Sequence, residues 1–408
     1  MDQHDSTTGV AVVGAGPYGL SVAAHLASRA LKHRVFGRPM DWWLNLPPSL
    51  GLKSHDFATN VSVPHRGYRF VEYCRAQGRS LAEPISFALF AEYGQWVQRR
   101  LLPWVEPCHV TRVSRCDGGF QVTLETGERV LANAVVVCTG LAHWQHVPSA
   151  FARLPRDLVS HTSEPIDFGR YRGREVTVIG AGASALEAAT LMHESGACVR
   201  LLVRGGPPEF GGVPTSPRPL KERLMYPPSA LGPGRKNFLL DRLPSAAHHL
   251  LSDDRRVRLT RTHLGPLGPW WLRDRFEGKV GVHHACQVVQ ADEAQAGVLL
   301  TVRSGGNREW QLRTDHVVCG TGYEIDVDRH PILEVSIREQ VQRIVRAPRL
   351  TANFESSVPG LYFTGPAAMF SFGPLFRFVA GAAHAAPVVA RHLSRRLPAG
   401  AARRRARM

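Results

Sequence analysis

An apolar strand, a glycine-rich turn and the start of a helix follow one another twice in this chain, at residues 10–20 and 176–186. Each copy is followed later in the chain by an apolar strand that ends in Thr-Gly, at 134–140 and 317–322. From the first glycine of the turn to the cysteine of the later strand there are 124 residues in one copy and 139 in the other. Because the whole order of motifs repeats, the sequence predicts two nucleotide-binding domains in one chain.

The three glycines of the first turn have distinct roles in such a motif. Gly14 permits the tight turn, Gly16 lets the backbone approach a pyrophosphate, and Gly19 lets the helix pack closely on the strand. The amide groups at the helix start face the phosphates, and the helix dipole favours their negative charge. The second turn has the same pattern, with alanine as its third small residue.

Arginine stands where an acidic residue often follows the second strand of such a domain. Arg38 comes after the strand predicted at 33–36, and Arg204 comes after the strand predicted at 199–203. An acidic residue there binds the ribose of NADH and repels a 2′-phosphate, whereas arginine accommodates it. Arg204 therefore predicts a preference for NADPH, while Arg38 could meet a phosphate or stack on adenine.

Composition excludes several classes of protein. The 408 residues carry a net charge of +16 from scattered arginines and one run at 403–405, and we expect them to attract phosphate-bearing cofactors rather than nucleic acid. Seven cysteines without C-x-x-C or paired Cys/His spacing argue against a dithiol redox centre, a zinc site and a disulfide scaffold. No apolar run approaches the roughly 20 residues of a membrane span. The polar start at 1–8 is unlike a signal peptide, so we expect a cytoplasmic protein without a metal site.

Two segments without a clean period are expected to carry the site. Residues 39–54 are rich in proline and aromatic residues and predict a structured loop whose single cation is Lys53. A proline-rich insertion at 205–275 lies where the second domain would continue, and long loops are usually functional or mobile. Loops at the carboxyl ends of parallel strands tend to hold the ligand, so we expect the substrate pocket between these two segments.

The remaining segments predict ordinary elements. Residues 68–101 are expected to be helical, and strands are expected at 110–113, 120–124 and 129–131. Near the end, 360–365 predicts a strand and a turn. Proline after glycine at Gly373-Pro374 predicts a helix start, with a helix running to about Leu393.

Together these motifs resemble the flavoproteins with two dinucleotide-binding domains, and among them the FAD- and NADPH-dependent monooxygenases. The nearest likeness is to the bacterial lysine/ornithine N-hydroxylase-like group, with the flavin-containing monooxygenases more distant and some similar proteins resembling urate hydroxylases. The resemblance covers nearly the whole chain and rests on Gly14–Gly19, Leu50–Lys53, Ser160–Thr162, Gly180–Glu187, Gly320–Tyr323 and Phe372–Arg377.

This resemblance implies an α/β fold with two Rossmann-like dinucleotide-binding domains, the NADPH domain inserted into the FAD domain. The FAD domain would occupy 1–160 and 317–394, and the NADPH domain 161–316 with the proline-rich insertion 205–275. We expect a basic, disordered tail at 395–408.

The resemblance also implies which residues hold the cofactors FAD and NADPH. Lys53 is the candidate catalytic residue, because a cation beside the flavin ring would stabilise the anionic reduced flavin, although it could also fix an anionic substrate. The FAD residues would be Gly14, Gly16, Pro17, Tyr18, Gly19, Gly37, Arg38, Trp43, Lys53, Val110, Thr139, Gly140, Gly365, Gly373, Pro374 and Leu375; the NADPH residues would be Gly180, Gly182, Ser184, Ala185, Arg204, Thr321 and Gly322.

The implied activity is the transfer of one oxygen atom from O2 to a small-molecule substrate. NADPH reduces the flavin, oxygen adds at flavin C4a, and the resulting (hydro)peroxide oxidises the substrate by N-hydroxylation or another hydroxylation, or attacks a carbonyl. Two other classes stay open: a flavin-dependent NAD(P)H oxidoreductase that reduces a quinone or other acceptor, and a non-catalytic flavin-binding or nucleic-acid-binding protein. The identity of the substrate and the oligomeric state stay open as well.

Overall fold

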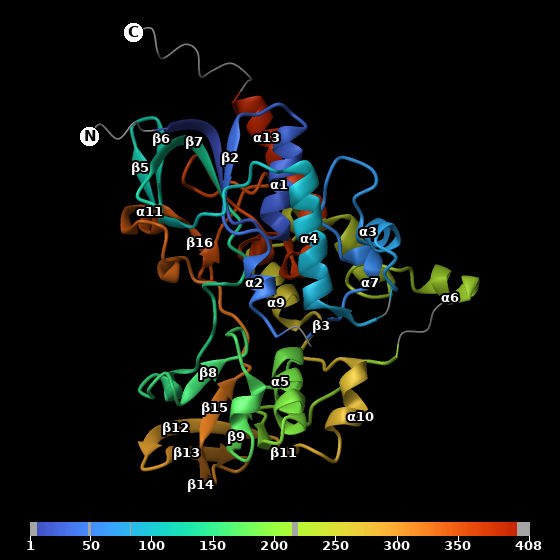
Figure 1. Ribbon diagram of the computed structural model, residues 1–408, viewed down its shortest axis with the longest axis vertical. Coiled ribbons are helices and arrows are strands. Elements are labelled where there is room, and N and C mark those ends of the chain that lie inside the picture. The colour runs from blue at the N-terminus through green and yellow to red at the C-terminus, as the bar shows by residue number, and fades with distance from the viewer. Residues whose placement is uncertain (1–5, 48–49, 82, 214–218, 398–408) are drawn as a thin grey trace.

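A mixed sheet and a parallel sheet, each with its helices, form the two halves of the molecule in the computed structural model of the chain (Figure 1). The structure describes residues 6–47, 50–81, 83–213 and 219–397. Most of the predicted basic tail and the first five residues lie outside the described ranges.

The first sheet is built around β1, whose residues Val10–Val13 are at most 4% exposed. This strand pairs in parallel with β2 and β7, as expected for an apolar run inside a sheet. Strand β7 has two further partners: its first half pairs antiparallel with β6, and its last three residues pair in parallel with β18. The strand predicted at 129–131 is therefore the beginning of β7 and not a separate strand. The members of this sheet are β1 (Ser6–Val13), β2 (His33–Phe36), β5 (Val110–Cys116), β6 (Gly119–Leu124), β7 (Arg129–Val137) and β18 (Leu361–Phe363).

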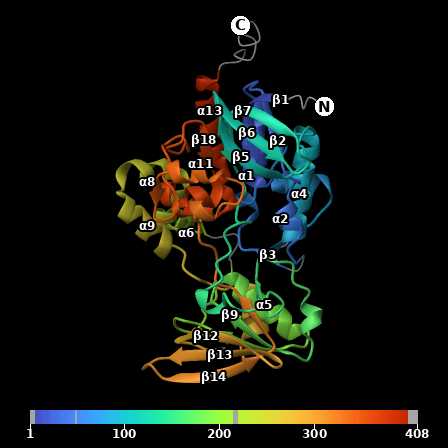
Figure 2. The same ribbon diagram turned by 90° about the vertical axis from the view of Figure 1, so that its left-hand side faces the viewer.

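The second sheet is entirely parallel, in the order β11-β10-β9-β15-β8. A three-stranded antiparallel sheet lies at the lower end of the molecule (Figure 2). All these strands fall in the sequence between β7 and β18, so the second Rossmann-like domain is inserted into the first, and the predicted fold class is confirmed. Their bounds are β8 (Val159–His161), β9 (Glu175–Ile179), β10 (Cys198–Leu202), β11 (Gly281–His283), β15 (His316–Cys319), and β12 (Cys286–Ala294), β13 (Gly297–Ser304) and β14 (Glu309–Thr314).

Helix α1 (Pro17–Ala27) packs against α13 (Ala382–Arg396), which joins the two parts of the first domain. Four alanines of α13 are completely buried, and their small side chains let the two helices approach each other closely. The region predicted as helical at 68–101 is divided in two by a short strand, and the Ser86 hydroxyl caps the second helix by accepting from the Leu89 amide. The other elements are α2 (Asp41–Leu44), β3 (Gly51–Leu52), α3 (Phe70–Ala76), β4 (Ile85–Ser86), α4 (Phe87–Leu101), α5 (Ala183–Glu194), α10 (Arg273–Phe276), α11 (Val335–Gln340), β16 (Arg343–Ile344), β17 (Ala347–Pro348) and α12 (Met369–Phe372).

The prediction of one helix from Pro374 to about Leu393 is wrong. Pro374–Arg377 forms a short 3₁₀ turn, the chain then extends at Phe378, and α13 begins only at Ala382. A tertiary contact lies at the break, because the Tyr18 hydroxyl donates to the Phe378 carbonyl at 2.7 Å. The Gly381 amide also donates to that carbonyl at 3.2 Å, so helical hydrogen bonding resumes only after the extended residue Phe378.

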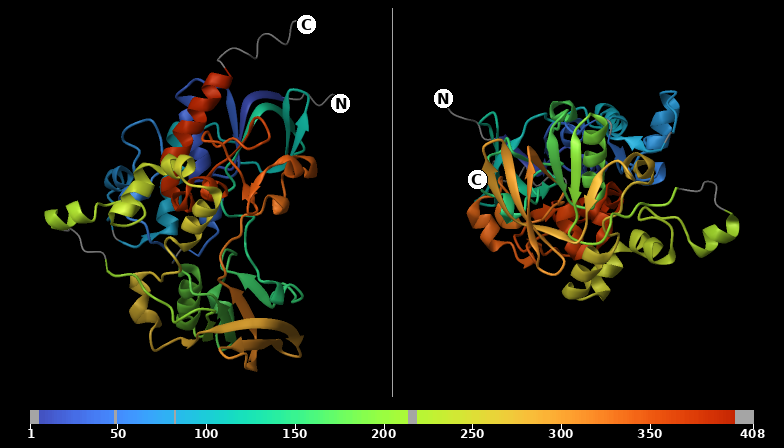
Figure 3. Two further views of the ribbon diagram at one scale, coloured as in Figure 1. Left: turned by 180° about the vertical axis from the view of Figure 1, so that it is seen from behind. Right: turned by 90° about the horizontal axis from the view of Figure 1, so that it is seen from below.

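The proline-rich insertion is helical over much of its length, where the sequence predicted a long loop. Helices α8 (Pro244–Leu250) and α9 (Asp253–Thr262) pack against α12 of the first domain. Figures 2 and 3 show the yellow helices of the insertion beside the red segment of the first domain. Prolines stand between or at the starts of the helices, where they are tolerated. The two remaining helices are α6 (Leu220–Met225) and α7 (Arg235–Arg242).

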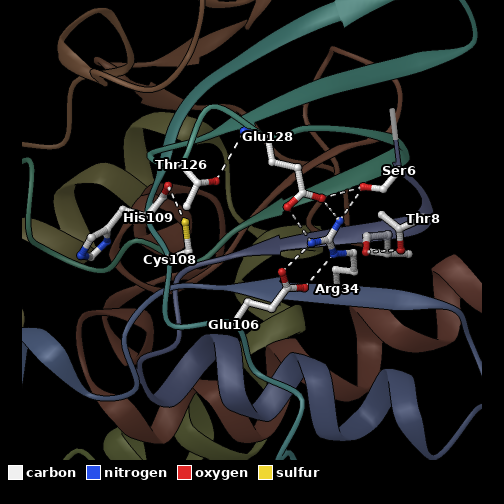
Figure 4. A network of polar contacts seen from close by, with 9 residues as sticks. Ser6, Thr8, Arg34, Glu106, Cys108, His109, Thr126 and Glu128 are labelled. Atoms are coloured by element: carbon white, nitrogen blue, oxygen red, sulfur yellow. Dashed lines mark hydrogen bonds and ion pairs between the residues drawn. The ribbon is translucent and has the colours of Figure 1, made fainter. Parts of the chain in front are cut away.

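The guanidinium of Arg34 joins several segments at one edge of the first sheet (Figure 4). It donates to Glu106 through Nε at 2.7 Å and to Glu128 through Nη1 at 2.7 Å, and it also reaches the Ser6 hydroxyl at 2.6 Å. The Arg34 side chain is only 23% exposed, so water screens these charges incompletely. The same contacts lower the pKa of the Glu128 carboxyl.

Replacing Arg34 with methionine should lower the free energy of unfolding by about 1–3 kcal/mol, because two carboxylates lose their shared, partly buried partner. The control is Arg303→Met, since Arg303 and Glu309 form an ion pair with both side chains 47% exposed. That change should cost less than about 1 kcal/mol. Urea unfolding followed by circular dichroism measures both variants, and equal losses would contradict a special contribution from Arg34.

Candidate functional site

The first glycine turn is closed on its inner side. Gly14 has φ +107°, and a Cβ there would lie 2.5 Å from the Cys138 carbonyl oxygen. At Gly19 a Cβ would lie 1.7 Å from the carbonyl oxygen of Gly14. Both positions therefore require glycine, because any side chain would push α1 away from β1 and β7.

The same turn is open on its outer side. A Cβ at Gly16 would meet nothing within 4 Å, and no side chain caps the first turn of α1. The amides at a helix start have no partner within the helix, and the dipole makes this end positive. The geometry fits the pyrophosphate of a dinucleotide, which would approach Gly16 and accept hydrogen bonds from these amides.

The second glycine turn repeats this arrangement. Gly180 has φ +134°, and a Cβ there would lie 2.3 Å from the carbonyl oxygen of Gly320. Gly182 has open space around a hypothetical Cβ, and α5 also starts without a side-chain cap. A Cβ at Gly320 would lie 2.5 Å from the Cβ of Ala185, so β15 and α5 need a small pair here. The second domain therefore fits a second dinucleotide.

Several predicted FAD residues gather around the first turn. A Cβ at Gly37 would lie 2.9 Å from the Ala15 amide, and one at Gly365 would lie 3.3 Å from the Tyr18 ring. Thr139 directly follows the Cys138 carbonyl that closes the turn, and its hydroxyl lies 3.3 Å from His330 Nε2. Segments distant in the sequence thus meet at one end of the first sheet.

Arg38 lies at the outer edge of this region. Its guanidinium is 3.6 Å from Glu125, and its side chain is 55% exposed. The Glu125 carboxylate accepts from the His109 amide at 3.1 Å, so His109, the neighbour of Val110 in the chain, and Arg38 contact the same carboxylate. Hydrogen bonding from the His109 backbone is the main cause that lowers the pKa of Glu125.

The predicted NADPH residues do not all lie at the second turn. Ser184 and Arg204 are exposed, at the start of α5 and just after the end of β10. Thr321 and Gly322 instead contact the link between the domains: the Thr321 hydroxyl donates to the His146 carbonyl, and the Gly322 carbonyl lies 3.0 Å from His161 Nε2. Burial lowers the pKa of His161 to about 4, so it is neutral at pH 7.

Trp43 and Lys53 of the predicted loop have different surroundings. Trp43 packs edge-on against Phe87 and Phe90, with ring centroids 5.3 and 4.9 Å away. The Lys53 ammonium donates to the Leu267 carbonyl of the insertion. Lys53 is exposed, yet burial by the surrounding protein lowers its pKa. Residues 48–49 of this loop lie outside the described ranges.

Glu187 of α5 lies at the end of the second glycine motif, and the sequence pattern predicts no role for it. Its carboxylate is 5% exposed, and Oε1 accepts from the Gly51 amide of the first domain at 3.4 Å. Trp271 packs beside this contact, because a Cβ at Gly51 would lie 3.1 Å from its ring. Burial raises the pKa of Glu187 to about 7, although Gly51, Lys53 and Arg275 oppose the shift.

The insertion is bound to the segment that contains Gly373, Pro374 and Leu375. The His248 ring stacks on Phe372 with centroids 4.8 Å apart, and its Nδ1 lies 3.1 Å from the Ser371 carbonyl. Arg377 donates through Nη1 to the His263 carbonyl at 3.1 Å. Loop 50–54, the insertion and residues 371–377 therefore converge, and the sequence offers no periodic signal that predicts this convergence.

Other kinds of site have no support in the described part of the chain. No cluster of three or more histidine, cysteine or acidic side chains there could hold a metal ion. Among the described helices, none combines the length and the apolar character needed to cross a bilayer.

Several known proteins are similar to this chain. A family model for pyridine nucleotide-disulphide oxidoreductases matches residues 11–212. The FAD-dependent urate hydroxylase of Xanthomonas campestris pv. campestris is 26% identical over 204 residues, which cover 46% of this chain and 43% of that protein. A ferredoxin–NADP reductase of Saccharopolyspora erythraea is 28% identical over 195 residues, covering 47% and 53%. The chain thus spans about half the length of these curated relatives.

Among solved structures, the ornithine N-hydroxylase of Kutzneria sp. 744 is similar with a TM-score of 0.75 and 19% identity. The match covers 96% of this chain and 99% of that chain, whose structure contains reduced FAD, NADP+ and L-ornithine. The chain therefore shares a two-domain fold with two Rossmann-like units with this hydroxylase, over nearly the full length of both chains.

Glu187 should make stability depend on pH in a defined direction. Its folded pKa of about 7 lies above the ordinary 4.5, so the folded state binds more protons between these values. The stability of the wild type should therefore fall as pH rises from about 4.5 to 7 and then level off. Glu187→Gln keeps the acceptor for Gly51 and should remove this decline, gaining at most about 3 kcal/mol at pH 8.

Thermal unfolding of the wild type and Glu187→Gln at pH 5 and pH 8 tests this expectation. Glu194→Gln is a suitable control, because Arg275 holds the pKa of that carboxyl below its ordinary value. A difference between wild type and Glu187→Gln that is the same at both pH values would show that Glu187 does not titrate as described.

Proposed function

We propose that this protein is an FAD-dependent monooxygenase that uses NADPH and O2 to transfer one oxygen atom to a small-molecule substrate. The observation that carries the proposal is the pair of open glycine turns, one in each domain of a fold shared with an N-hydroxylase that contains FAD and NADP+. N-hydroxylation and other hydroxylations are both consistent with this arrangement.

FAD would be held by the first turn and NADPH by the second. The amides at the starts of α1 and α5 would bind the two pyrophosphates, and Arg204 would meet the 2′-phosphate of NADPH. Tyr18 would hold the start of α1 in place at the first site, because its buried hydroxyl donates to the Phe378 carbonyl. When bound, the two cofactors would supply hydride transfer and the activation of O2.

The remaining task of the chain is to orient the substrate and exclude water. Phe370, Phe372 and Phe376 are buried beside Gly373–Leu375, and α8 and α9 cover this segment. An apolar wall of this kind keeps water from a reactive centre. Lys53 would then orient the substrate or stabilise negative charge at the flavin ring.

A second candidate is a flavin-dependent reductase that passes electrons to an acceptor without inserting oxygen. The 28% identity to a ferredoxin–NADP reductase favours it. A dithiol mechanism is not part of this alternative, because the sequence contains no C-x-x-C.

The deciding experiment incubates the purified protein with NADPH, O2 and candidate amines, ketones and purines. A product heavier by one oxygen atom, formed in proportion to NADPH consumed, supports the monooxygenase. Steady reduction of a quinone or ferredoxin under nitrogen, with no oxygenated product in air, would favour the reductase.

Gly16→Val should fold and yet lack flavin. The added side chain meets no protein atom within 4 Å of its Cβ and φ at Gly16 is −80°, but it would occupy the path of the pyrophosphate. The purified wild type should be yellow and the variant colourless, as absorbance near the flavin band measures. Gly182→Val is the matched control, which should keep its flavin and lose reduction by NADPH. Full flavin occupancy in Gly16→Val would contradict the placement of FAD.

Arg204→Ala should weaken NADPH selectively. An exposed arginine after β10 would contribute a charge-assisted contact to the 2′-phosphate, which NADH lacks. We expect KM for NADPH to rise roughly 10-fold or more, with KM for NADH changed less than about 2-fold. Steady-state flavin reduction with each nucleotide measures both KM values. An equal rise in KM for NADPH and NADH would show that Arg204 does not bind the 2′-phosphate.

A further inference from the structure

Two cationic side chains and an imidazole converge where loop 50–54, the insertion and turn 374–377 meet. The Lys53 ammonium donates to the Leu267 carbonyl, and Arg377 donates to the His263 carbonyl. Burial is the main cause that lowers the pKa of Lys53; the charge of Glu187 opposes this shift and that of Arg377 adds to it, so both groups lie within electrostatic range of Lys53. Three segments that are distant in the sequence thus place positive charge at one location.

This charge is not neutralised by an ion pair. Within the described ranges, neither Lys53 nor Arg377 forms an ion pair with a carboxylate. Both residues are exposed, yet burial by neighbouring protein lowers the pKa of each. The neighbouring protein lowers the local dielectric around these two cations, which strengthens their attraction for an anion.

The acid that faces these groups is a weak counter-charge. Glu187 accepts from the Gly51 amide, and its raised pKa of about 7 leaves it partly protonated at neutral pH. Arg275, which also acts on Glu187, is bound by Glu194 through two hydrogen bonds of 2.8 and 2.7 Å. Positive charge therefore exceeds negative charge at this location.

His263 joins Lys53 and Arg377 as the third member of this cluster, and one of its ring nitrogens has no hydrogen-bond partner among the described residues. This nitrogen, Nε2, is buried. Lys236 and Arg377 lie near enough to lower the pKa of His263, after burial as the larger cause. A neutral imidazole nitrogen beside two cations can complete the contacts of a carboxylate or of an acidic ring.

We propose that Lys53, Arg377 and His263 bind the anionic group of a substrate that carries a carboxylate or an acidic heterocycle. The inference rests on the proposed function and deepens it by naming the substrate class. An amine placed with its cationic group at this cluster would be disfavoured, because no fully ionised carboxylate there offsets its positive charge.

The test measures binding of isosteric acid and amine pairs to the FAD-loaded protein by calorimetry at pH 7. The probes are phenylacetate with phenethylamine, hexanoate with hexylamine, and indole-3-acetate with tryptamine. At least one acid should bind roughly 10-fold tighter than its amine, since charge-assisted hydrogen bonds favour it. Lys53→Gln and Arg377→Gln should each reduce that preference several-fold, whereas Arg75→Gln, an exposed cation on α3, should not.

The same variants separate a substrate site from a cofactor site. NADP+ should bind Lys53→Gln and Arg377→Gln as tightly as it binds the wild type. Weaker NADP+ binding with an unchanged acid preference would assign the cations to the nucleotide phosphates and overturn the inference. Amines that bind as tightly as the acids, or no binding of any acid at 10 mM (about the weakest affinity that calorimetry measures), would also overturn it. Loss of FAD or absence of oxygenated product would instead count against the proposed function.

Discussion

Both domains depend on the close approach of a helix start to the end of a buried strand. At Gly19 a Cβ would lie 1.7 Å from the Gly14 oxygen, and at Gly320 it would lie 2.5 Å from the Ala185 Cβ. Without this approach α1 and α5 could not start directly at the carboxyl ends of β1 and β9. The amides of the first turn would then not face open space at Gly16 and Gly182. One steric requirement thus produces two equivalent anion-binding ends in the same chain.

Long-range contacts turn these two ends into one candidate site. The Tyr18 hydroxyl binds the Phe378 carbonyl, which attaches the first glycine turn to a segment near the end of the chain. The insertion then covers that segment through His248 and α9. Glu187 and Gly51 join the second domain to the loop of the first. The positions of the predicted cofactor residues relative to one another therefore depend on contacts between elements far apart in sequence.

Prediction succeeded where the signal is local. The apolar runs of β1, β9 and β15 and the glycines after β1 and β9 are typical of parallel strands and tight turns, whatever surrounds them. It failed where a partner elsewhere decides the local conformation. Proline after Gly373 is a good helix start, yet the turn ends at the extended residue Phe378, which the Tyr18 hydroxyl of α1 contacts. The proline-rich composition of the insertion predicts a long loop, yet its prolines stand at or between the ends of helices.

The sequence by itself determined that the chain has two Rossmann-like domains, because the glycine and strand patterns express short-range steric needs. The insertion of one domain into the other was implied by the family resemblance, and the strand order of the structure shows it. It also pointed to Lys53 as the cation of the loop. Only the tertiary structure decided that the charges of Glu187 and Arg377 act on Lys53, although 134 and 324 residues separate them from it along the chain. Charge and burial act through space, so the pKa of Glu187 and the unpaired charge of Arg377 depend on neighbours that no local pattern contains.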